Sequence, residues 1–386
     1  MEGQERVAMH QLNTLHRTLV VVAGLTLAAC GSSDGGNALH GEIDAAQGAF
    51  DLSGLPQDDL TTTDASPIVV PPNTWTWVEL GDNFCDDGSV TGIGVNVTNT
   101  SKLLVYFEGG GACGDFASCY QANTATHGPF TKAEFTARLA SGGGSIFDRN
   151  VGNNPFAGYS LVYIPYCTGD VHSGNRVATY SLGADVRQYH HVGHTNALHA
   201  LDRLTATFPN VTTVVITGSS AGGFGSAINY ASYRAQWPQA TAYLIDDSGP
   251  LFDASVTPSL LRNWYASWGV LDWITMICPD CATSTSKLYD ALSAHFPNDR
   301  MALLSSLQDS VVRAFYGMQP AAFQTALLRL SANELDPLPR FRRFFVTGGS
   351  HTMLGSPSAY TAKGVVLWTW LSQMVTDDPA WTAVAP

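Results

Sequence analysis

The fold is decided by the stretch TVVITGSSAGGFG, residues 213–225. Its β-branched first half favours a buried strand, and its later run of small residues suits the start of a helix. Between them, Gly218, Ser220 and Gly222 complete a Gly-x-Ser-x-Gly pattern. In a strand–turn–helix setting this pattern predicts a nucleophile elbow, which exposes a serine hydroxyl on a strained turn. We expect a side chain at either glycine to collide with the neighbouring strand or helix. The alternative is a tight turn with only a structural role.

A free serine hydroxyl is a poor nucleophile, so a histidine base must reach it and an acid must orient that base. In hydrolases with this elbow, the acid and then the histidine follow the serine along the chain. We expect the base to be His351, because it lies in a loop directly after the predicted strand at residues 342–347. The other histidines precede the serine or lie at a helix end, which suits solvated or packed residues: His190, His191, His194, His199 and His295.

Two aspartates compete for the role of the acid. Asp309 follows the predicted strand at residues 301–307 and begins the next predicted helix. An aspartate there is also a good N-cap, which is its structural alternative. Asp247 follows the predicted strand at residues 242–245, directly after the elbow half of the chain. We favour Asp309 and keep Asp247 as the alternative.

A second glycine-rich stretch, Gly109-Gly-Gly111, ends the predicted strand at residues 102–107. Backbone without side chains lets N–H groups point at a developing oxyanion. The stretch is similar to the HGGG device of esterases, in which the amide after the nucleophile, here that of Ala221, is the other donor. Residues 109–114 also spell the GxGxxG pattern of dinucleotide-binding proteins, but Gly128-Pro129 breaks the unit expected next. We therefore predict an oxyanion hole and no cofactor.

Apolar segments of strand length recur along the chain and alternate with helical stretches. The predicted strands lie at residues 75–80, 102–107, 160–165, 212–217, 242–245, 301–304 and 341–346, and predicted helices at 194–208 and 366–374. This alternation favours an α/β fold with a mostly parallel sheet covered by helices on both faces. There is no internal repeat, so residues 67–386 are predicted to form one domain.

The N-terminal residues 1–29 have the pattern of a secretory signal. Arg17 precedes an apolar run too short to span a membrane, and small residues follow it. The ending Leu27-Ala-Ala-Cys30 is similar to a bacterial lipobox, in which the cysteine becomes the lipidated first residue. We expect a lipoprotein of the cell envelope, periplasmic or on the cell surface, which contacts the membrane only through this anchor. The alternative is a buried helix with a chance cysteine.

Residues 30–66 are rich in Gly, Ser and Asp and are predicted to be a flexible tether. They hold seven acidic residues and no lysine or arginine, so residues 67–386 carry −6 of the net charge of −13. The chain has no basic stripe for a phosphate backbone, which argues against nucleic acid as a partner.

Six further cysteines in an exported chain suggest disulfides. Cys278-Pro-Asp-Cys281 alone could also indicate zinc or redox chemistry. A zinc site needs about four ligands, and no matching pair lies nearby in the sequence. We favour a small-loop Cys278–Cys281 disulfide and predict no metal site.

Five motifs follow one another along most of residues 75–355. They are CDDGS (85–89), FEGGGAC (107–113) with Cys119, YCTGDVHSG (166–174), the elbow, and Asp247-Ser-Gly249. Together they resemble the pectin acetylesterase/Notum family of serine carboxylesterases. The resemblance implies an α/β-hydrolase fold and a catalytic triad of Ser220, Asp309 and His351. It also implies an oxyanion hole from Gly110, Gly111 and Ala221, and disulfides Cys85–Cys167 and Cys113–Cys119.

The chain departs from the family at positions that bear on the substrate. Gly111-Ala112 stands where an aromatic often follows the glycines, and His172 stands where a bulky apolar residue is common. Residues 251–281 lie where such hydrolases insert a cap, and Trp264 and Trp268 share one face of a predicted helix there. We expect His172, Trp264 and Trp268 to be candidate substrate-binding residues, with ordinary core packing as the alternative for the tryptophans.

Three functions fit these observations. The first is removal of acyl groups, most simply acetyl, from esters on carbohydrate. Polygalacturonate is disfavoured because an acidic domain repels a polyanion. The second is a lipase-like esterase for longer acyl chains. The third is a catalytically silent lipoprotein that binds glycan. The substrate is thus a small ester or an acylated glycan, and the oligomeric state is left open.

Overall fold

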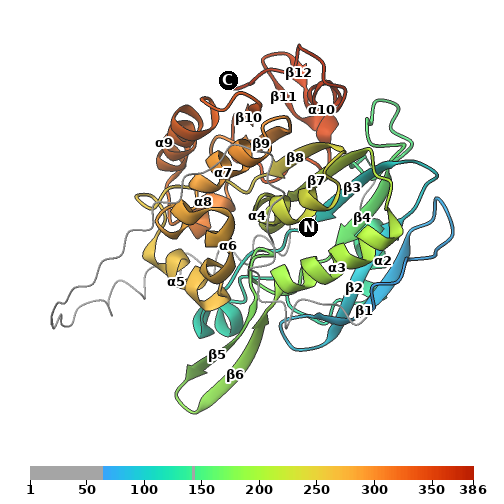
Figure 1. The fold of residues 1–386 in the computed structure, drawn as a ribbon. Coiled ribbons are helices and arrows are strands. Elements are labelled where there is room, and N and C mark those ends of the chain that lie inside the picture. The colour runs from blue at the N-terminus through green and yellow to red at the C-terminus, as the bar shows by residue number, and fades with distance from the viewer. Residues whose placement is uncertain (1–63, 141–143) are drawn as a thin grey trace, which may run out of the picture.

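The computed structural model describes residues 64–140 and 144–386 (Figure 1). The predicted signal peptide, Cys30 and nearly all of the predicted tether lie outside the described residues. Among the residues that are described, no helix combines the length and hydropathy needed to cross a membrane.

An eight-stranded sheet forms the centre of the domain, in the order β1-β2-β4-β3-β7-β8-β9-β10. The strands β3, β4, β7, β8, β9 and β10 run parallel, while β1 and β2 are antiparallel additions at one edge. Their bounds are β1 Thr76–Phe84, β2 Val90–Asn96, β3 Lys102–Phe107, β4 Ser160–Ile164, β7 Thr213–Ser219, β8 Thr241–Asp247, β9 Arg300–Ser306 and β10 Phe341–Val346. The mostly parallel α/β architecture predicted from the sequence is confirmed.

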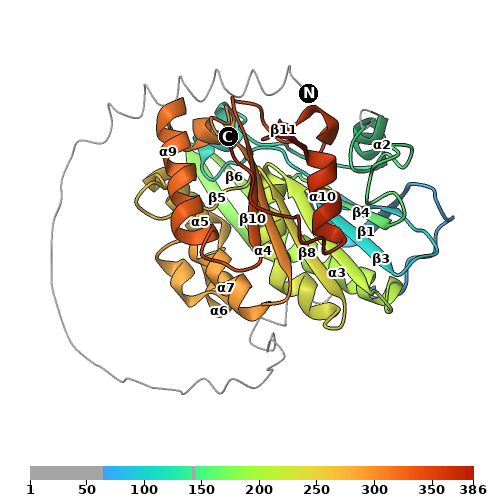
Figure 2. The ribbon, with the colours of Figure 1, turned by 90° about the horizontal axis from the view of Figure 1, so that it is seen from above.

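Alternate residues of the central strands enter two separate cores, as the two-residue period of a strand requires. In β7, Val214 and Ile216 pack into the larger core, together with helices α3 and α4. Val215 between them faces the second core, which includes helix α10. Helices therefore cover both faces of the sheet (Figure 2), and the predicted helices at 194–208 and 366–374 correspond to α3 and α10.

Helices form the layers on the two faces of the sheet and also a cap between β8 and β9. The helices are η3 Ala117–Gln121, α2 Lys132–Ala140, α3 Gly193–Thr207, α4 Ala221–Gln236, α5 Ser259–Trp268, α6 Leu271–Ile277, η4 Pro279–Ala282, α7 Lys287–His295, α8 Val312–Phe315, α9 Pro320–Leu330, η5 Ser331–Leu335, η6 Pro357–Ala359 and α10 Leu367–Val375. The cap consists of α5, α6, η4 and α7, where the sequence predicted an aromatic-rich insertion.

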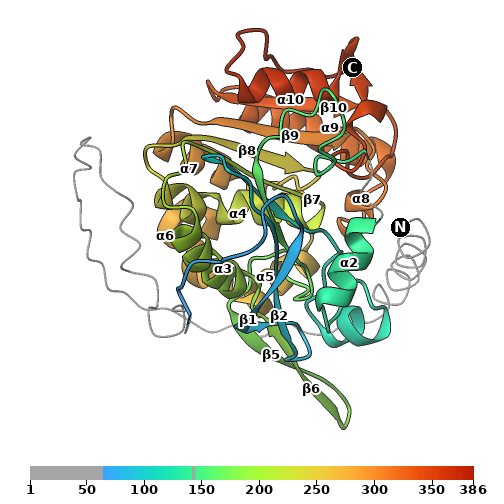
Figure 3. The same ribbon diagram turned by 90° about the vertical axis from the view of Figure 1, so that its right-hand side faces the viewer.

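Two small hairpins lie outside the main sheet. The antiparallel pair β5 (Arg176–Leu182) and β6 (Asp185–His191) projects from the body of the domain in Figures 1 and 3. The second pair, β11 (Thr361–Ala362) and β12 (Val365–Val366), precedes α10.

Three disulfides join the cysteines of the domain: Cys85–Cys167, Cys113–Cys119 and Cys278–Cys281. The first two are the pairs that the family resemblance implies, and the third is the pair that proximity indicates. The first links the β1–β2 turn to the segment after β4, which places two of the family motifs side by side.

Candidate active site

Ser220 occupies the turn between β7, which ends at Ser219, and α4, which begins at Ala221. Its φ of 61° and ψ of −122° lie in a region that is costly for a residue with a side chain. The turn is held by hydrogen bonds on both sides of Ser220. Its N–H donates to the carbonyl of Asp247 at 2.7 Å, and its own carbonyl accepts from Gly223 N at 2.8 Å. This conformation is typical of a nucleophile elbow.

The elbow depends on glycines because the neighbouring backbone leaves no room for a Cβ. A Cβ at Gly218 would overlap the carbonyl oxygen of Gly222, and one at Gly222 would overlap that of Phe107. The collisions predicted at these two positions are thus confirmed. A Cβ at Gly109 would lie 2.8 Å from Cβ of Ser220, so the glycine-rich stretch passes directly beside the serine.

His351 and Asp309 are paired at the same edge of the sheet. Asp309 follows the end of β9 and His351 follows the end of β10, and these strands are parallel neighbours. Nδ1 of His351 lies 2.8 Å from Oδ2 of Asp309 and 3.1 Å from Oδ1. The Asp309 side chain is fully buried, and that of His351 is 5% exposed. The imidazole is therefore oriented through Nδ1.

The second function considered for Asp309, capping a helix, is also present. Its Oδ1 accepts from the N–H groups of Val311 and Val312, each at 2.9 Å, at the start of the short helix α8. These charge-assisted bonds hold the Asp309 carboxylate in the orientation in which it contacts the imidazole of His351.

Asp247, the alternative acid, is engaged elsewhere. Its Oδ2 accepts from the hydroxyl of Ser219 and the amides of Met353 and Leu354, at 2.8, 2.8 and 2.9 Å. Burial raises the pKa of this carboxyl, and those hydrogen bonds oppose the rise. The geometry therefore favours Asp309 over Asp247 as the partner of His351 Nδ1.

The glycine-rich stretch is bound to residues 124–126 by backbone hydrogen bonds, and several of its own N–H groups have no such partner in the part of the chain that the structure describes. The carbonyl of Gly110 accepts from Thr126 N at 2.7 Å, and Ala112 N donates to the carbonyl of Thr124 at 3.2 Å. Gly111 has a φ of +80°, which glycine adopts without strain. Among the described residues, the N–H groups of Gly110, Gly111 and Ala221 have no hydrogen-bond acceptor. They are the donors that the sequence assigned to an oxyanion hole.

His172, a candidate substrate-binding residue, is buried in the structure. Its imidazole is buried behind the glycine-rich stretch, where Nε2 lies 2.8 Å from the carbonyl oxygen of Glu108. Burial lowers the pKa of His172 to about 4, so the neutral ring donates this bond. His172 is not among the residues that line the cavity beside Ser220, and its contact to Glu108 supports the backbone directly before the glycine-rich stretch.

Glu108 is a functional candidate that the sequence reasoning missed. Its buried carboxylate pairs with Arg138 at 2.8 Å and accepts from Tyr166 N at 3.0 Å. Burial raises the pKa of Glu108 to about 7, although Arg138 opposes the rise. The sequence signal for it was a charged residue directly before three glycines. A carboxylate that is buried there needs hydrogen-bonding partners, and these partners fix the backbone around it.

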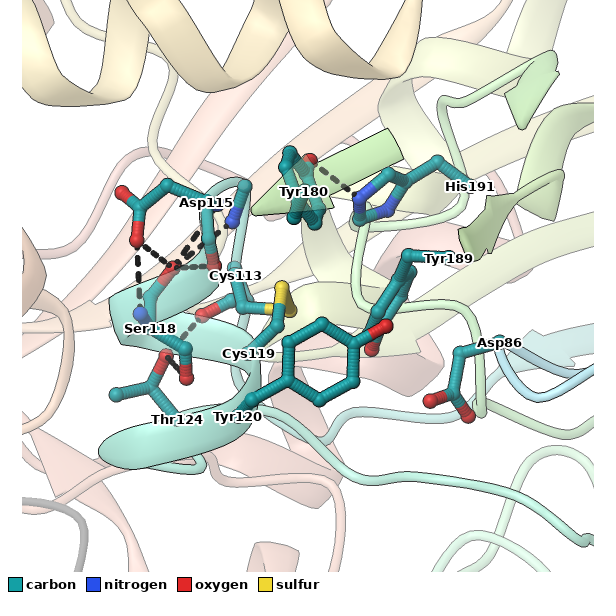
Figure 4. The surroundings of a disulfide bond; sticks show 12 residues. Asp86, Cys113, Asp115, Ser118, Cys119, Tyr120, Thr124, Tyr180, Tyr189 and His191 are labelled. Atoms are coloured by element: carbon teal, nitrogen blue, oxygen red, sulfur yellow. Dashed lines mark hydrogen bonds between the residues drawn. A yellow bond between two sulfur atoms is a disulfide. The ribbon is translucent and has the colours of Figure 1, made fainter. Parts of the chain in front are cut away.

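The cap tryptophans fasten α5 to the segment that follows the glycines. Trp264 Nε1 donates to Asp115 Oδ2 and Trp268 Nε1 to the carbonyl of Cys113, both at 2.8 Å. Figure 4 shows the Cys113–Cys119 disulfide beside Asp115 and Ser118, whose amide bonds the Asp115 carboxylate at 2.8 Å. Each indole is 1% exposed. Trp268 borders the cavity described next, whereas Trp264 does not.

An apolar cavity of about 830 Å³, counting its open mouth, begins at Ser220 and extends beneath the cap. Two hydroxyls on its wall donate to backbone carbonyls. Ser173 Oγ donates to the carbonyl of Asp170 at 2.6 Å, and Thr285 Oγ1 to that of Phe252 at 2.9 Å. Large side chains form much of the surface, among them Phe224, Ile228, Leu261, Tyr265, Trp268 and Phe315. The cavity suits a hydrocarbon group attached to the carbonyl carbon that Ser220 would attack.

Across residues 64–140 and 144–386, no group of three or more His, Cys, Asp or Glu side chains is arranged to hold a metal ion.

Comparison with known proteins agrees with the motifs. The chain is similar to the palmitoleoyl-protein carboxylesterase NOTUM of Schmidtea mediterranea, with 33% identity over 151 residues, 38% of this chain and 27% of the relative. It is 26% identical to pectin acetylesterase 5 of Arabidopsis thaliana over 218 residues, 53% of this chain and 49% of the relative. Palmitoleoyl-protein carboxylesterase notum2 of Xenopus laevis is 27% identical over 185 residues, 44% and 35% of the two chains.

The chain thus spans from about a quarter to a half of the length of these curated relatives. The family model for pectinacetylesterase matches residues 76–305, which include the glycine-rich stretch and the elbow and end before Asp309 and His351. Because this match extends over more than half of the sequence, the chain belongs to the pectinacetylesterase family.

Proposed function

We propose that the protein is a carboxylic ester hydrolase in which Ser220 is the nucleophile, His351 the general base and Asp309 the acid that orients it. The observation that carries the proposal is the buried His351–Asp309 pair, at 2.8 Å, on the sheet edge that also bears the strained Ser220. Membership of the pectinacetylesterase family supports the same chemistry. The paired base and acid argue against the catalytically silent glycan-binding alternative.

The reaction follows from these positions. His351 Nε2 takes the proton of Ser220 Oγ as that oxygen attacks the ester carbonyl, and Asp309 stabilises the imidazolium that forms. The N–H groups of Gly110, Gly111 and Ala221 stabilise the oxyanion. His351 returns the proton to the departing alcohol and leaves an acyl ester on Ser220. Water, deprotonated by the same base, then attacks the carbonyl carbon of this acyl ester. The bond to Ser220 Oγ breaks, His351 returns the proton to that oxygen, and the carboxylic acid is released.

The cavity supports an acyl chain longer than acetyl. Phe224 and Ile228 line it at four and eight residues beyond Ser220 on α4. At a rise of about 1.5 Å per residue, Ile228 lies roughly 12 Å along the helix from the serine. At about 1.5 Å per carbon–carbon bond this distance spans on the order of eight bonds. An acetyl group would leave most of this apolar surface in contact with water. The lipase-like alternative is therefore our preferred function, and the names of the NOTUM relatives specify a palmitoleoyl ester.

Removal of acetyl groups from carbohydrate is the second candidate function. The family description and the similarity to pectin acetylesterase 5 favour it. Stacking of a sugar on Trp264 or Trp268 does not support it, because both tryptophans are buried in the cap.

We also propose that the domain works outside the cytoplasm, with residues 1–29 as signal peptide, Cys30 as the lipidated residue and residues 30–66 as tether to a domain at 67–386. The three disulfides support export, because such bonds persist in oxidising compartments. Mass spectrometry of the mature N-terminus tests this. Diacylglycerol on Cys30 is expected, and a mature protein that retains residues 1–29 would contradict it.

The enzymatic proposal is tested with p-nitrophenyl acetate and p-nitrophenyl octanoate, using wild type and Ser220→Ala. We expect both rates to vanish in the variant and kcat/KM of the wild type to be at least tenfold higher for octanoate. A higher value for acetate would favour the second candidate, and equal rates in both proteins would exclude Ser220 as the nucleophile.

A further inference from the structure

Asp247 connects the two halves of the candidate site. It is the last residue of β8, paired in register with Ser219 at the end of β7. Its carbonyl oxygen accepts from Ser220 N at 2.7 Å, and its Oδ2 accepts from Ser219 Oγ at 2.8 Å. The same oxygen accepts from the amides of Met353 and Leu354, at 2.8 and 2.9 Å. One side chain therefore holds both the strand that presents the nucleophile and the loop that presents the base.

A second path runs from the same carboxylate to the residue after His351. Ser248 Oγ donates to Asp247 Oδ1 at 3.1 Å and accepts from Thr352 N at 3.3 Å. The amides of three consecutive residues after His351, from Thr352 to Leu354, are thus bound directly or through one hydroxyl to Asp247. The other side of the loop is tied to the Asp309 segment, where Gln308 N and Ser310 N donate to the carbonyls of Gly348 and Gly349.

The backbone around this carboxylate is strained. Ser220, Ser248 and Thr352 have φ values of 61°, 67° and 63°, and none of them is glycine. Thr352 is β-branched, for which the left-handed region is especially unfavourable. Such conformations persist only where surrounding contacts over-determine them. Each of these three residues bonds to Asp247, borders it, or is linked to it through the Ser248 hydroxyl. The hydrogen bonds of Asp247 are therefore among the contacts that hold the three strained conformations.

Resting on the function proposed above, we propose that Asp247 is a positioning residue that fixes the His351 loop relative to the Ser220 elbow. It acts as a hydrogen-bond acceptor for both segments and takes no part in proton transfer. Misplacement of a catalytic group by about 1 Å can cost on the order of 100-fold in rate, so loss of this acceptor should lower turnover while substrate binding in the apolar cavity persists.

Asp246 provides a matched control. It is the preceding residue of the same strand and is equally buried. Its carboxyl accepts from Gly249 N at 2.8 Å and lies 3.5 Å from the Tyr289 hydroxyl. It has no hydrogen bond to Ser219 or to residues 352–354, so truncating it removes a buried carboxyl without cutting the link between the elbow and the histidine loop.

The experiment compares Asp247→Ala, Asp247→Asn and Asp246→Ala in the full chain, with p-nitrophenyl octanoate as substrate and the melting temperature of each variant. We expect Asp247→Ala to lower kcat about 100-fold with KM within about twofold. Asp247→Asn should recover most of kcat, because its amide oxygen can accept from the Met353 and Leu354 amides. Asp246→Ala should lower the melting temperature and leave kcat within about twofold.

Wild-type kcat in Asp247→Ala, an equal loss in Asp246→Ala, or no recovery in a folded Asp247→Asn would each overturn the proposal. If Asp247→Ala does not fold, the double variant Ser219→Ala/Ser248→Ala removes the two hydroxyl links and keeps the carboxylate. It should lose about tenfold in kcat, and an unchanged kcat would overturn the proposal. Ser220→Ala is measured alongside. Residual activity in that variant would refute the proposed nucleophile itself. If Ser220→Ala is inactive, a contrary result for the Asp247 variants refutes only the role proposed for Asp247.

Discussion

Nδ1 of His351 lies 2.8 Å from Oδ2 of Asp309, although 42 residues separate them in the chain. The contact arises because β9 and β10 are parallel neighbours and both residues lie in the loops after the carboxyl ends of these strands. The Nδ1–H bond fixes the tautomer in which Nε2 carries the lone pair needed to deprotonate a serine.

Asp309→Asn should therefore reduce kcat by roughly 10³- to 10⁴-fold with little change in KM, because an amide can donate to Nδ1 and favour the wrong tautomer. Steady-state hydrolysis of p-nitrophenyl octanoate measures this. Since Asp309 also caps α8, circular dichroism and the melting temperature of the variant serve as the folding control. A folded variant with more than a tenth of wild-type kcat would show that another acid orients His351.

Ile228→Trp should shorten the acyl chain that the enzyme accepts. The larger ring would occupy the cavity about two helical turns from Ser220 and leave the first turn open. We expect kcat/KM for octanoate to fall at least tenfold and that for acetate to stay within about twofold. Ile228→Val is the control, because it enlarges the cavity slightly and should keep both rates. Equal losses for the two esters in Ile228→Trp would mean that the acyl chain binds elsewhere.

The disulfides should differ in what they contribute to stability. Cys85–Cys167 closes a separation of 82 residues and Cys278–Cys281 one of three. In the chain-entropy model their removal by paired Cys→Ser substitutions costs about 4.5 and about 1.6 kcal/mol of unfolding free energy. Urea unfolding compares the two. Neither pair touches the reacting atoms, so esterase activity of the folded variants should persist. Loss of activity without loss of stability would contradict this division.

The contribution of Asp246 to the unfolding free energy should fall as the pH rises from about 4 to 8. Burial raises the pKa of Asp246 from 3.8 to about 8, and the neighbouring Asp247 adds to the rise. Between these values the folded state keeps a proton that the unfolded state has released. The stabilising contribution of Asp246 is therefore fully present below its unfolded pKa. It is lost as the pH rises toward 8, at about 1 kcal/mol per pH unit.

Asp246→Asn replaces the protonated carboxyl with a neutral amide that can still accept from Gly249 N. Urea titrations of wild type and variant at several pH values between 4 and 8 should show that the variant gains stability relative to the wild type as the pH rises. Identical slopes would mean that Asp246 is ionised in the folded protein throughout this range.

The elbow and the positions of most central strands along the chain were predictable because their signals are local. The β-branched run before Ser220 and the glycines around it specify a strand, a turn and a helix within thirteen residues. Strand β2 was missed because its sequence VTGIGVN contains two glycines, which weaken a strand signal. The β5–β6 hairpin was missed because only two residues of each strand are buried, which leaves little alternation of apolar and polar residues in its sequence.

The details that the sequence could not supply depend on contacts between distant segments. His172 takes its role from a bond to Glu108, 64 residues away, and from a left-handed φ of 57° that its sequence context does not signal. Asp247 was weighed as an acid, but its partners in the His351 loop lie more than 100 residues further on. Neither role follows from spacing or residue type alone.

The most direct test of the account is covalent labelling with a fluorophosphonate probe, followed by peptide mapping. The probe reacts with a serine only when a base and an oxyanion hole activate it. We predict a single modified serine, Ser220, with labelling suppressed by p-nitrophenyl octanoate and abolished in His351→Ala. Labelling at a different serine, or an active enzyme whose Ser220 stays unmodified, would contradict the central claim that Ser220 and His351 carry the reaction.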